Sequence, residues 1–126
     1  MNDPVEDLWK AWADGRLCLQ NCTKCGALQH PPGPVCGHCH ATTLGLIDIA
    51  PTGKIVAWST VHRAPSAIFA DEVPYTIAII ALDPTTFIES RISPAVVESD
   101  LRVDMSVRLE LGEIGGRAMP VVAGLV

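Results

Sequence analysis

The sequence predicts a mainly β protein made of an N-terminal helix, a four-cysteine metal ribbon and a small antiparallel barrel. Three observations support this fold class. A short amphipathic stretch opens the chain, two Cys-x-x-Cys pairs follow it, and short apolar segments punctuated by glycine and proline fill the remainder. The expected division is residues 1–15 for the helix, 16–43 for the ribbon and 44–126 for the barrel.

The N-terminal stretch carries start and stop signals for a helix. Asp3 is a suitable N-cap, Pro4 takes the first helical position, and Glu6 stands three residues after the cap. Gly15 is expected to end the helix. One face is apolar, with residues recurring at helical spacing: Val5, Leu8, Trp9 and Trp12. The tryptophans are expected in the core or, alternatively, as anchors for a partner subunit.

The two cysteine pairs are the central motif. Each pair has two residues between its cysteines, and residues 26–35 separate the pairs, so four thiolates can converge on one tetrahedral ion. We expect one structural zinc per chain in a rubredoxin-like ribbon, although spacing alone does not distinguish zinc from iron. The expected ligands are Cys22, Cys25, Cys36 and Cys39. Gly26 and Gly37 are expected to provide the backbone freedom that the two turns need.

Other residues near the motif suggest alternatives. A redox-active disulfide is disfavoured, because such motifs open a helix and nothing helical follows either pair. Cys18 is a fifth sulfur, but in a short strand at residues 17–20 it is expected to be a buried apolar side chain. Three histidines are further possible ligands and are expected to be solvated loop side chains: His30, His38 and His40.

From residue 44 onward the pattern is that of an all-β module. The strands are expected at residues 44–49, 54–63, 75–82, 86–92, 106–111 and 117–125, with turns at 51–53, 83–84 and 112–116. Residues 107–111 alternate cleanly, so one face should be buried, whereas residues 77–82 are apolar throughout and should be covered on both faces. Closing these strands into a barrel removes exposed edges, and an OB-fold is the expected form.

Composition limits the function classes. The 126 residues include nine basic and fourteen acidic side chains, a formal charge of −5, with two Phe and one Tyr. This balance argues against nucleic acid as a partner, since single-strand binding uses aromatics in a basic groove. A single-stranded nucleic-acid module nevertheless remains the rival binding function for an OB-fold. No run is long enough to span a membrane and no secretory start is present, so a cytoplasmic protein with reduced cysteines is expected.

Several segments resemble a known family, the acyl-CoA-associated OB-fold family with a rubredoxin-like zinc ribbon. The matching segments are Asp14-Gly15-Arg16-Leu17, the two cysteine pairs, Pro31-Pro32, Gly53-Lys54-Ile55-Val56 and Val73-Pro74-Tyr75. The resemblance implies a non-catalytic partner of a thiolase-superfamily enzyme: a thiolase, an acyltransferase or an aldolase of steroid side-chain degradation. It also implies a hetero-oligomer that helps to hold or channel an acyl-CoA. The family usually has glycine where this chain has Asp104, and no basic cluster for a CoA phosphate accompanies Asp71 and Glu72.

An independent catalytic role has little support in the sequence. A closed four-cysteine site is the structural pattern, and no catalytic residue is assigned. The best remaining constellation is His62 with three residues that follow it: Asp71, Glu72 and Tyr75. A free-standing acyl-CoA enzyme that uses His62 is therefore the second rival. Arg63 is expected to be a surface residue or a contact to a phosphate or a partner carboxylate.

Overall fold

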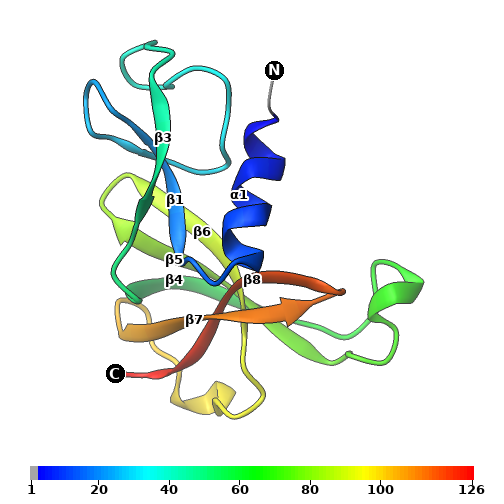
Figure 1. Cartoon of the computed structure of the whole chain (residues 1–126). Helices are drawn as coiled ribbons and strands as arrows, with labels where there is room; N and C mark the ends of the chain where they lie inside the picture. Colours follow the sequence, from blue (N-terminus) through cyan, green and yellow to red (C-terminus); the bar gives the residue numbers. More distant parts are fainter. Residues whose placement is uncertain (1–2) are drawn as a thin grey trace.

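The computed structural model describes residues 3–126 as a helix, a ribbon sheet and a closed barrel (Figure 1). The ribbon part contains α1 (Pro4–Ala13), β1 (Cys18–Cys22), β2 (Leu28–Gln29) and β3 (Leu44–Asp48), with sheet order β2-β1-β3. The barrel contains β4 (Thr52–Val61), β5 (Tyr75–Asp83), β6 (Thr86–Ile92), β7 (Ser106–Ile114) and β8 (Arg117–Leu125), in the order β4-β5-β6-β8-β7. Two 3-10 turns, Ala67–Phe69 and Glu98–Asp100, lie in its loops. The predicted fold class, including the OB-fold barrel, is confirmed.

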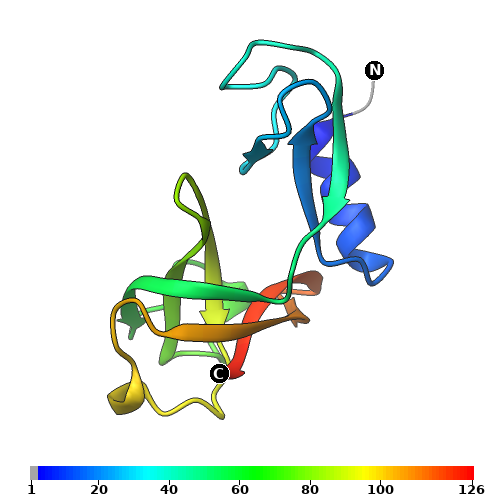
Figure 2. The same ribbon diagram turned by 90° about the vertical axis from the view of Figure 1, so that its left-hand side faces the viewer.

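The ribbon and the helix stand together over one side of the barrel, and the β5–β6 hairpin rises from the barrel toward them (Figure 2). Within residues 3–126, no helix is long and apolar enough to cross a membrane. Residues 1 and 2 of the segment predicted as helical lie outside the described residues. The predicted division at residues 15 and 43 stays a prediction, because one apolar core runs from α1 through the ribbon into the barrel.

The predicted start and stop signals of α1 operate as expected. The Asp3 Oδ1 atom accepts a hydrogen bond from the Val5 amide at 2.9 Å, and Pro4 occupies the first turn. The chain leaves the helix through Gly15, whose φ of +90° is a left-handed conformation that glycine adopts without steric cost.

The helix stripe packs inside this chain. Leu8 and Trp12 are 1% and 4% exposed, and the Trp12 indole Nε1 donates a hydrogen bond to the Cys18 carbonyl at 2.9 Å. Trp9 is half-buried, and the Arg117 guanidinium lies 3.6 Å from its ring centroid. Because Trp12 is already covered by this chain, its alternative role as an exposed anchor for a partner is wrong.

Two predictions about the strands need correction. The strand predicted at 44–49 forms as β3, but it pairs with β1 in the ribbon sheet, with Gln20 opposite Leu46, and not with the barrel. The turn predicted at 51–53 is also misplaced, since Thr52 and Gly53 already belong to β4. β2 was not predicted, because two residues are too short to show a period.

The barrel core follows the alternation of its strands. On β7, Val107 and Leu109 are 0% and 1% exposed, and the residues that alternate with them, Ser106, Arg108 and Glu110, are exposed, as predicted. On β5, Ile80 is fully buried, but Ile79 is 38% exposed. The expectation that residues 77–82 are covered on both faces is therefore wrong in this chain, because the outer face of β5 is only partly covered.

A glycine at position 53 is required by packing rather than by a turn. A Cβ atom there would overlap the Ile80 Cγ2 methyl group and lie 3.0 Å from the Ala81 carbonyl oxygen. We expect Gly53→Ala to destabilise the fold by about 1–3 kcal/mol, the usual cost of overpacking. Urea unfolding checks this, with Gly45→Ala as the control, because a Cβ at Gly45 meets only ordinary contacts of 3.7 Å and 3.8 Å. Equal midpoints for the two variants would contradict the packing argument.

Asp104, where the resembling family has glycine, has φ of +68°. Its amide donates to the Ile55 carbonyl at 2.8 Å and so fixes the loop before β7 against β4. Aspartate tolerates this left-handed conformation better than most residues do. The position therefore keeps a backbone geometry suited to glycine without having glycine.

Candidate metal centre and the adjoining cleft

The structure brings the four predicted cysteines together at the outer end of the ribbon. Their four Sγ atoms all lie within 4.8 Å of one another. The Sγ atoms of Cys22 and Cys39 are 3.5 Å apart, and those of Cys25 and Cys36 are 3.7 Å apart. Four thiolates bound to zinc at about 2.3 Å would be separated by about 3.8 Å in a tetrahedron. The donor set therefore fits one tetrahedral metal ion.

Backbone amides prepare the sulfurs for a metal. The amides of His38 and Cys39 lie 3.3 Å and 3.4 Å from the Cys36 sulfur. Hydrogen bonds from Cys39 and then His38 lower the pKa of the Cys36 thiol to about 6. The Cys25 amide, 3.5 Å from the Cys22 sulfur, is the largest cause of a lowered pKa at Cys22. Because metals bind thiolates, the lowered pKa values favour ligation at Cys22 and Cys36. At Cys25 the Ala27 amide also lowers the thiol pKa, but burial and hydrogen bonds to the other thiols outweigh it and raise that pKa to about 11.

The two turns use different residues at equivalent positions. The residue after the first pair is Gly26, with φ of +79°, as predicted. The residue after the second pair is His40, with φ of +64°, so the prediction that Gly37 provides this freedom is wrong. Gly37 instead donates a hydrogen bond from its amide to Gln29 Oε1 at 2.7 Å. A Cβ atom at position 37 would lie 3.3 Å from the same oxygen.

Two glutamines that the sequence analysis did not single out organise the proline-rich loop. Gln20 is 5% exposed, and its side chain donates to the Gly33 carbonyl and accepts from the Gly33 amide, both at 2.9 Å. Gln29 donates to Gln20 Oε1 at 3.0 Å and to the Val35 carbonyl at 3.1 Å. This network holds the second cysteine pair over the first. A glutamine within an otherwise buried strand was the only signal in the sequence.

The other candidate ligands stay outside the cluster. Cys18 is fully buried, as predicted, and burial raises the pKa of its thiol. His38 and His40 are exposed, as predicted. His30 is not the solvated residue that was expected: it is partly buried, its ring centroid is 6.2 Å from that of Trp12, and burial lowers its pKa.

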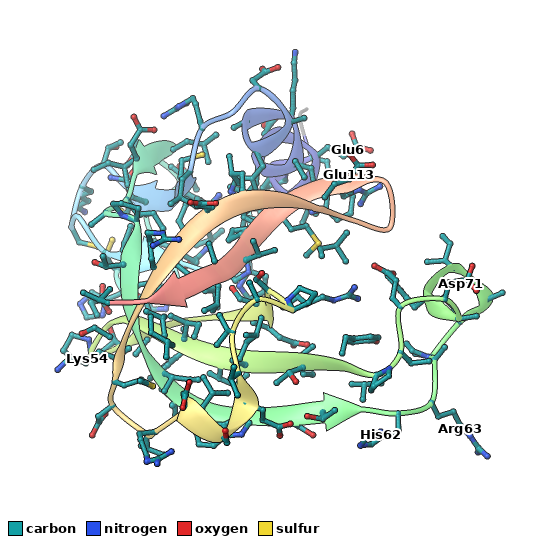
Figure 3. The ribbon with its side chains drawn as sticks, turned by 90° about the horizontal axis from the view of Figure 1, so that it is seen from below. Glu6, Lys54, His62, Arg63, Asp71 and Glu113 are labelled. Atoms are coloured by element: carbon teal, nitrogen blue, oxygen red, sulfur yellow. The ribbon has the colours of Figure 1, made fainter. Side chains whose placement is uncertain are left out.

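The possible catalytic constellation is not assembled. His62 and Arg63 are exposed at the end of β4 and point away from the barrel, while Asp71 lies on another part of the loop (Figure 3). Glu72 is already paired with Arg91, Oε1 to Nη1, at 2.7 Å. No side-chain hydrogen bond within residues 3–126 orients His62.

A cleft of about 560 Å³ lies where the ribbon meets the barrel. We call it the ribbon–barrel cleft; its lining includes His30, Val61, Arg63, Phe69, Tyr75, Ile77, Glu89, Ser90, Arg91, Met119 and Pro120. The Arg91 guanidinium lies 3.9 Å from the Tyr75 ring centroid and 5.3 Å from that of Phe69. A neighbouring pocket of about 530 Å³ shares Tyr75 and Arg91. Arg91 therefore forms a wall common to both hollows.

Comparison with protein families gives two matches in chain order. Residues 9–45 match the rubredoxin-like zinc ribbon domain of ChsH2, and residues 46–112 match the C-terminal OB-fold domain of ChsH2. The ribbon is thus a rubredoxin-like zinc ribbon whose four cysteines are positioned to bind one metal ion.

Solved structures and a curated relative extend these matches. A chain of the structure described as Ltp2-ChsH2(DUF35) aldolase is 28% identical, with a TM-score of 0.80 over 96% of this chain and 94% of that one. A DUF35-family protein of unknown function from Sulfolobus solfataricus shares the fold at 15% identity and a TM-score of 0.56, over 82% of this chain and 75% of that one. A probable enoyl-CoA hydratase alpha subunit of Thermomonospora curvata is 37% identical over 71 residues, which are 56% of this chain but only 22% of that protein.

Proposed function

This chain belongs to the ChsH2 family, and on that premise we propose that it is a non-catalytic accessory subunit of an acyl-CoA-processing complex. The partner is an enzyme of the thiolase superfamily, of the aldolase kind, and the two chains form a hetero-oligomer. The observation that carries this proposal is the match to a chain of the Ltp2-ChsH2(DUF35) aldolase over 96% of the present chain. The similarity to a probable enoyl-CoA hydratase subunit supports acyl-CoA chemistry in the same way.

The zinc ribbon has a structural role in this proposal. Cys22, Cys25, Cys36 and Cys39 are the four ligands, which leaves the metal without an open position. When bound, the metal would hold the two cysteine turns together. The hydrogen bonds of Gln20 and Gln29 fix the proline-rich loop that follows, next to the cleft. The chain therefore offers a preformed surface, which lowers the entropy cost of binding a partner.

The neighbouring pocket of about 530 Å³, beside the ribbon–barrel cleft, is the part of this surface that an acyl-CoA would pass. Its walls combine apolar residues with Arg91, but Glu72, Glu98 and Glu113 also line it, so it has no excess of positive charge for phosphates. The acyl chain, rather than the nucleotide, would face this subunit. The partner supplies the nucleophile and the base, and this chain completes the walls of the shared channel.

The test is co-expression of the tagged chain with each thiolase-superfamily protein encoded near it in the source genome. We expect one of them to co-purify on the tag and to elute with it as one species in size-exclusion chromatography with light scattering. The untagged enzyme passed over the same resin alone is the control for background binding. Failure of every such enzyme to co-purify with the folded, zinc-loaded chain would contradict the proposal.

A further inference from the structure

One edge of the barrel is unpaired where it faces the ribbon–barrel cleft. β6 runs from Thr86 to Ile92 and pairs with β5 along its length. On its other side it pairs with β8 only at Arg91 and Ile92, opposite Val121 and Val122. The ladder leaves residues 86–90 of β6 without a strand partner on that side, within the part of the chain that the structure describes. Such an edge presents a row of backbone donors and acceptors.

Buried polar groups at the same place also lack partners. Three buried side-chain atoms in residues 3–126 make no hydrogen bond, and all three belong to residues that line this cleft: His30 Nδ1, Ser90 Oγ and Arg91 Nε. Ser90 is only 2% exposed, and the Arg91 side chain is 13% exposed. Buried polar atoms are nearly always paired in folded proteins, so this cluster points to an occupant that supplies hydrogen bonds.

The chemistry of the cleft favours a polypeptide over an anion. Arg63, Arg91 and Glu89 line the cleft, and Arg91 is paired with Glu72 of the neighbouring pocket, so the two positive charges are matched by two negative ones. The Arg91 Nη1 atom already pairs with Glu72, and Nε is the buried Arg91 donor that has no partner. An extended peptide carries no net charge in its backbone, alternates donors with acceptors, and can place apolar side chains against Val61, Ile77 and Met119.

We propose that an extended segment of the partner enzyme adds to the open edge of β6 at residues 86–90 and fills the ribbon–barrel cleft. The inference rests on the proposed function, since it names how that partner is held. Backbone pairing along β6 supplies affinity, and the hydrogen bonds to Arg91 Nε and His30 Nδ1 fix the register of the added strand.

Hydrogen–deuterium exchange of the co-purified complex tests the backbone pairing. In the free chain, those amides of residues 86–90 that point away from β5 should exchange quickly. In the complex they should slow by at least about tenfold, as amides in a new ladder do. The outer edge of β3, Leu44–Asp48, is the matched control and should not change. Slowing of the β6 amides by acyl-CoA alone would assign the cleft to a small molecule and overturn the inference.

Substitutions test the side-chain contacts separately from the fold. Arg91→Lys removes the Nε donor while keeping the charge, and we expect it to weaken the complex by about tenfold or more, as at an interface hot spot. Glu72→Gln keeps Nε and should weaken it by less than about threefold. Arg108→Ala on exposed β7 should have no effect.

The outcomes separate the two proposals. This inference is overturned if the complex forms without protection of the β6 amides and if the partner binds the Arg91→Lys variant as tightly as it binds wild type. The proposed function would then still stand. Absence of any complex overturns both. Zinc content and the thermal midpoint of each variant show whether a loss of binding comes from unfolding.

Discussion

Replacement of any one of Cys22, Cys25, Cys36 or Cys39 by serine is expected to abolish stoichiometric zinc binding, whereas Cys18→Ser keeps one zinc per chain. The four sulfurs lie within 4.8 Å of one another, and no other cysteine or histidine in residues 3–126 joins that group. A serine hydroxyl is a far weaker zinc ligand than a thiolate, so each of the four variants leaves an incomplete site.

The size of the effect follows from how little else holds the outer ribbon. Its sheet consists of two five-residue strands, β1 and β3, and the two-residue strand β2. Binding of structural zinc contributes on the order of 10 kcal/mol in small zinc domains, more than this sheet can replace. We therefore expect the four variants to lose the ribbon and to become prone to aggregation. The apolar core that runs from α1 through the ribbon into the barrel contains none of the four cysteines, so the barrel and α1 should be affected less directly.

Elemental analysis after gel filtration measures the zinc content of each variant. Cys18→Ser is the matched control, because Cys18 is fully buried but makes no contribution to the cluster. It should lose some stability through altered packing and keep the metal. The ligand assignment would be wrong if Cys18→Ser lost zinc as completely as the other four, or if the wild-type chain held less than half an equivalent.

Local signals in the sequence were enough to predict the helix, the cysteine cluster and most strands. The cap at Asp3, the stop at Gly15 and the span of β6 all follow from neighbouring residues. The partner of a strand is not a local property, which is why β3 was assigned to the barrel although it pairs with β1. Gly53 was interpreted as a turn residue for the same reason, since its close neighbour Ile80 is distant in sequence.

The cleft was beyond sequence reasoning because its parts come from the ribbon and from several strands of the barrel. Arg91 and Tyr75 meet only when β5 and β6 are folded together. His30 reaches the same place from the ribbon. In the sequence, His62 looked like the better functional candidate, because it stands in a recognisable polar neighbourhood. The structure instead concentrates unpaired polar atoms around Arg91.

The isolated chain is expected to turn over no acyl-CoA, and the partner enzyme is expected to lose at least about a hundredfold in activity without it. The four-cysteine site has no open position for substrate. His62 is exposed and lacks an orienting side chain, so it does not have the arrangement of a general base. Loss of one wall of the substrate channel, by contrast, would admit water and let the bound substrate move. A displacement of the substrate by about 1 Å can lower the reaction rate about 10²-fold.

Assays of each chain alone and of the pair, with an acyl-CoA that the partner accepts, measure this dependence. His62→Ala in the pair should reduce kcat by less than about tenfold, whereas loss of a true general base typically costs about 10²- to 10⁴-fold. His38→Ala is the matched control, since His38 is an equally solvated histidine on the ribbon. Robust turnover by the isolated chain, or a thousandfold loss for His62→Ala with an intact complex, would mean that this subunit carries catalytic chemistry of its own.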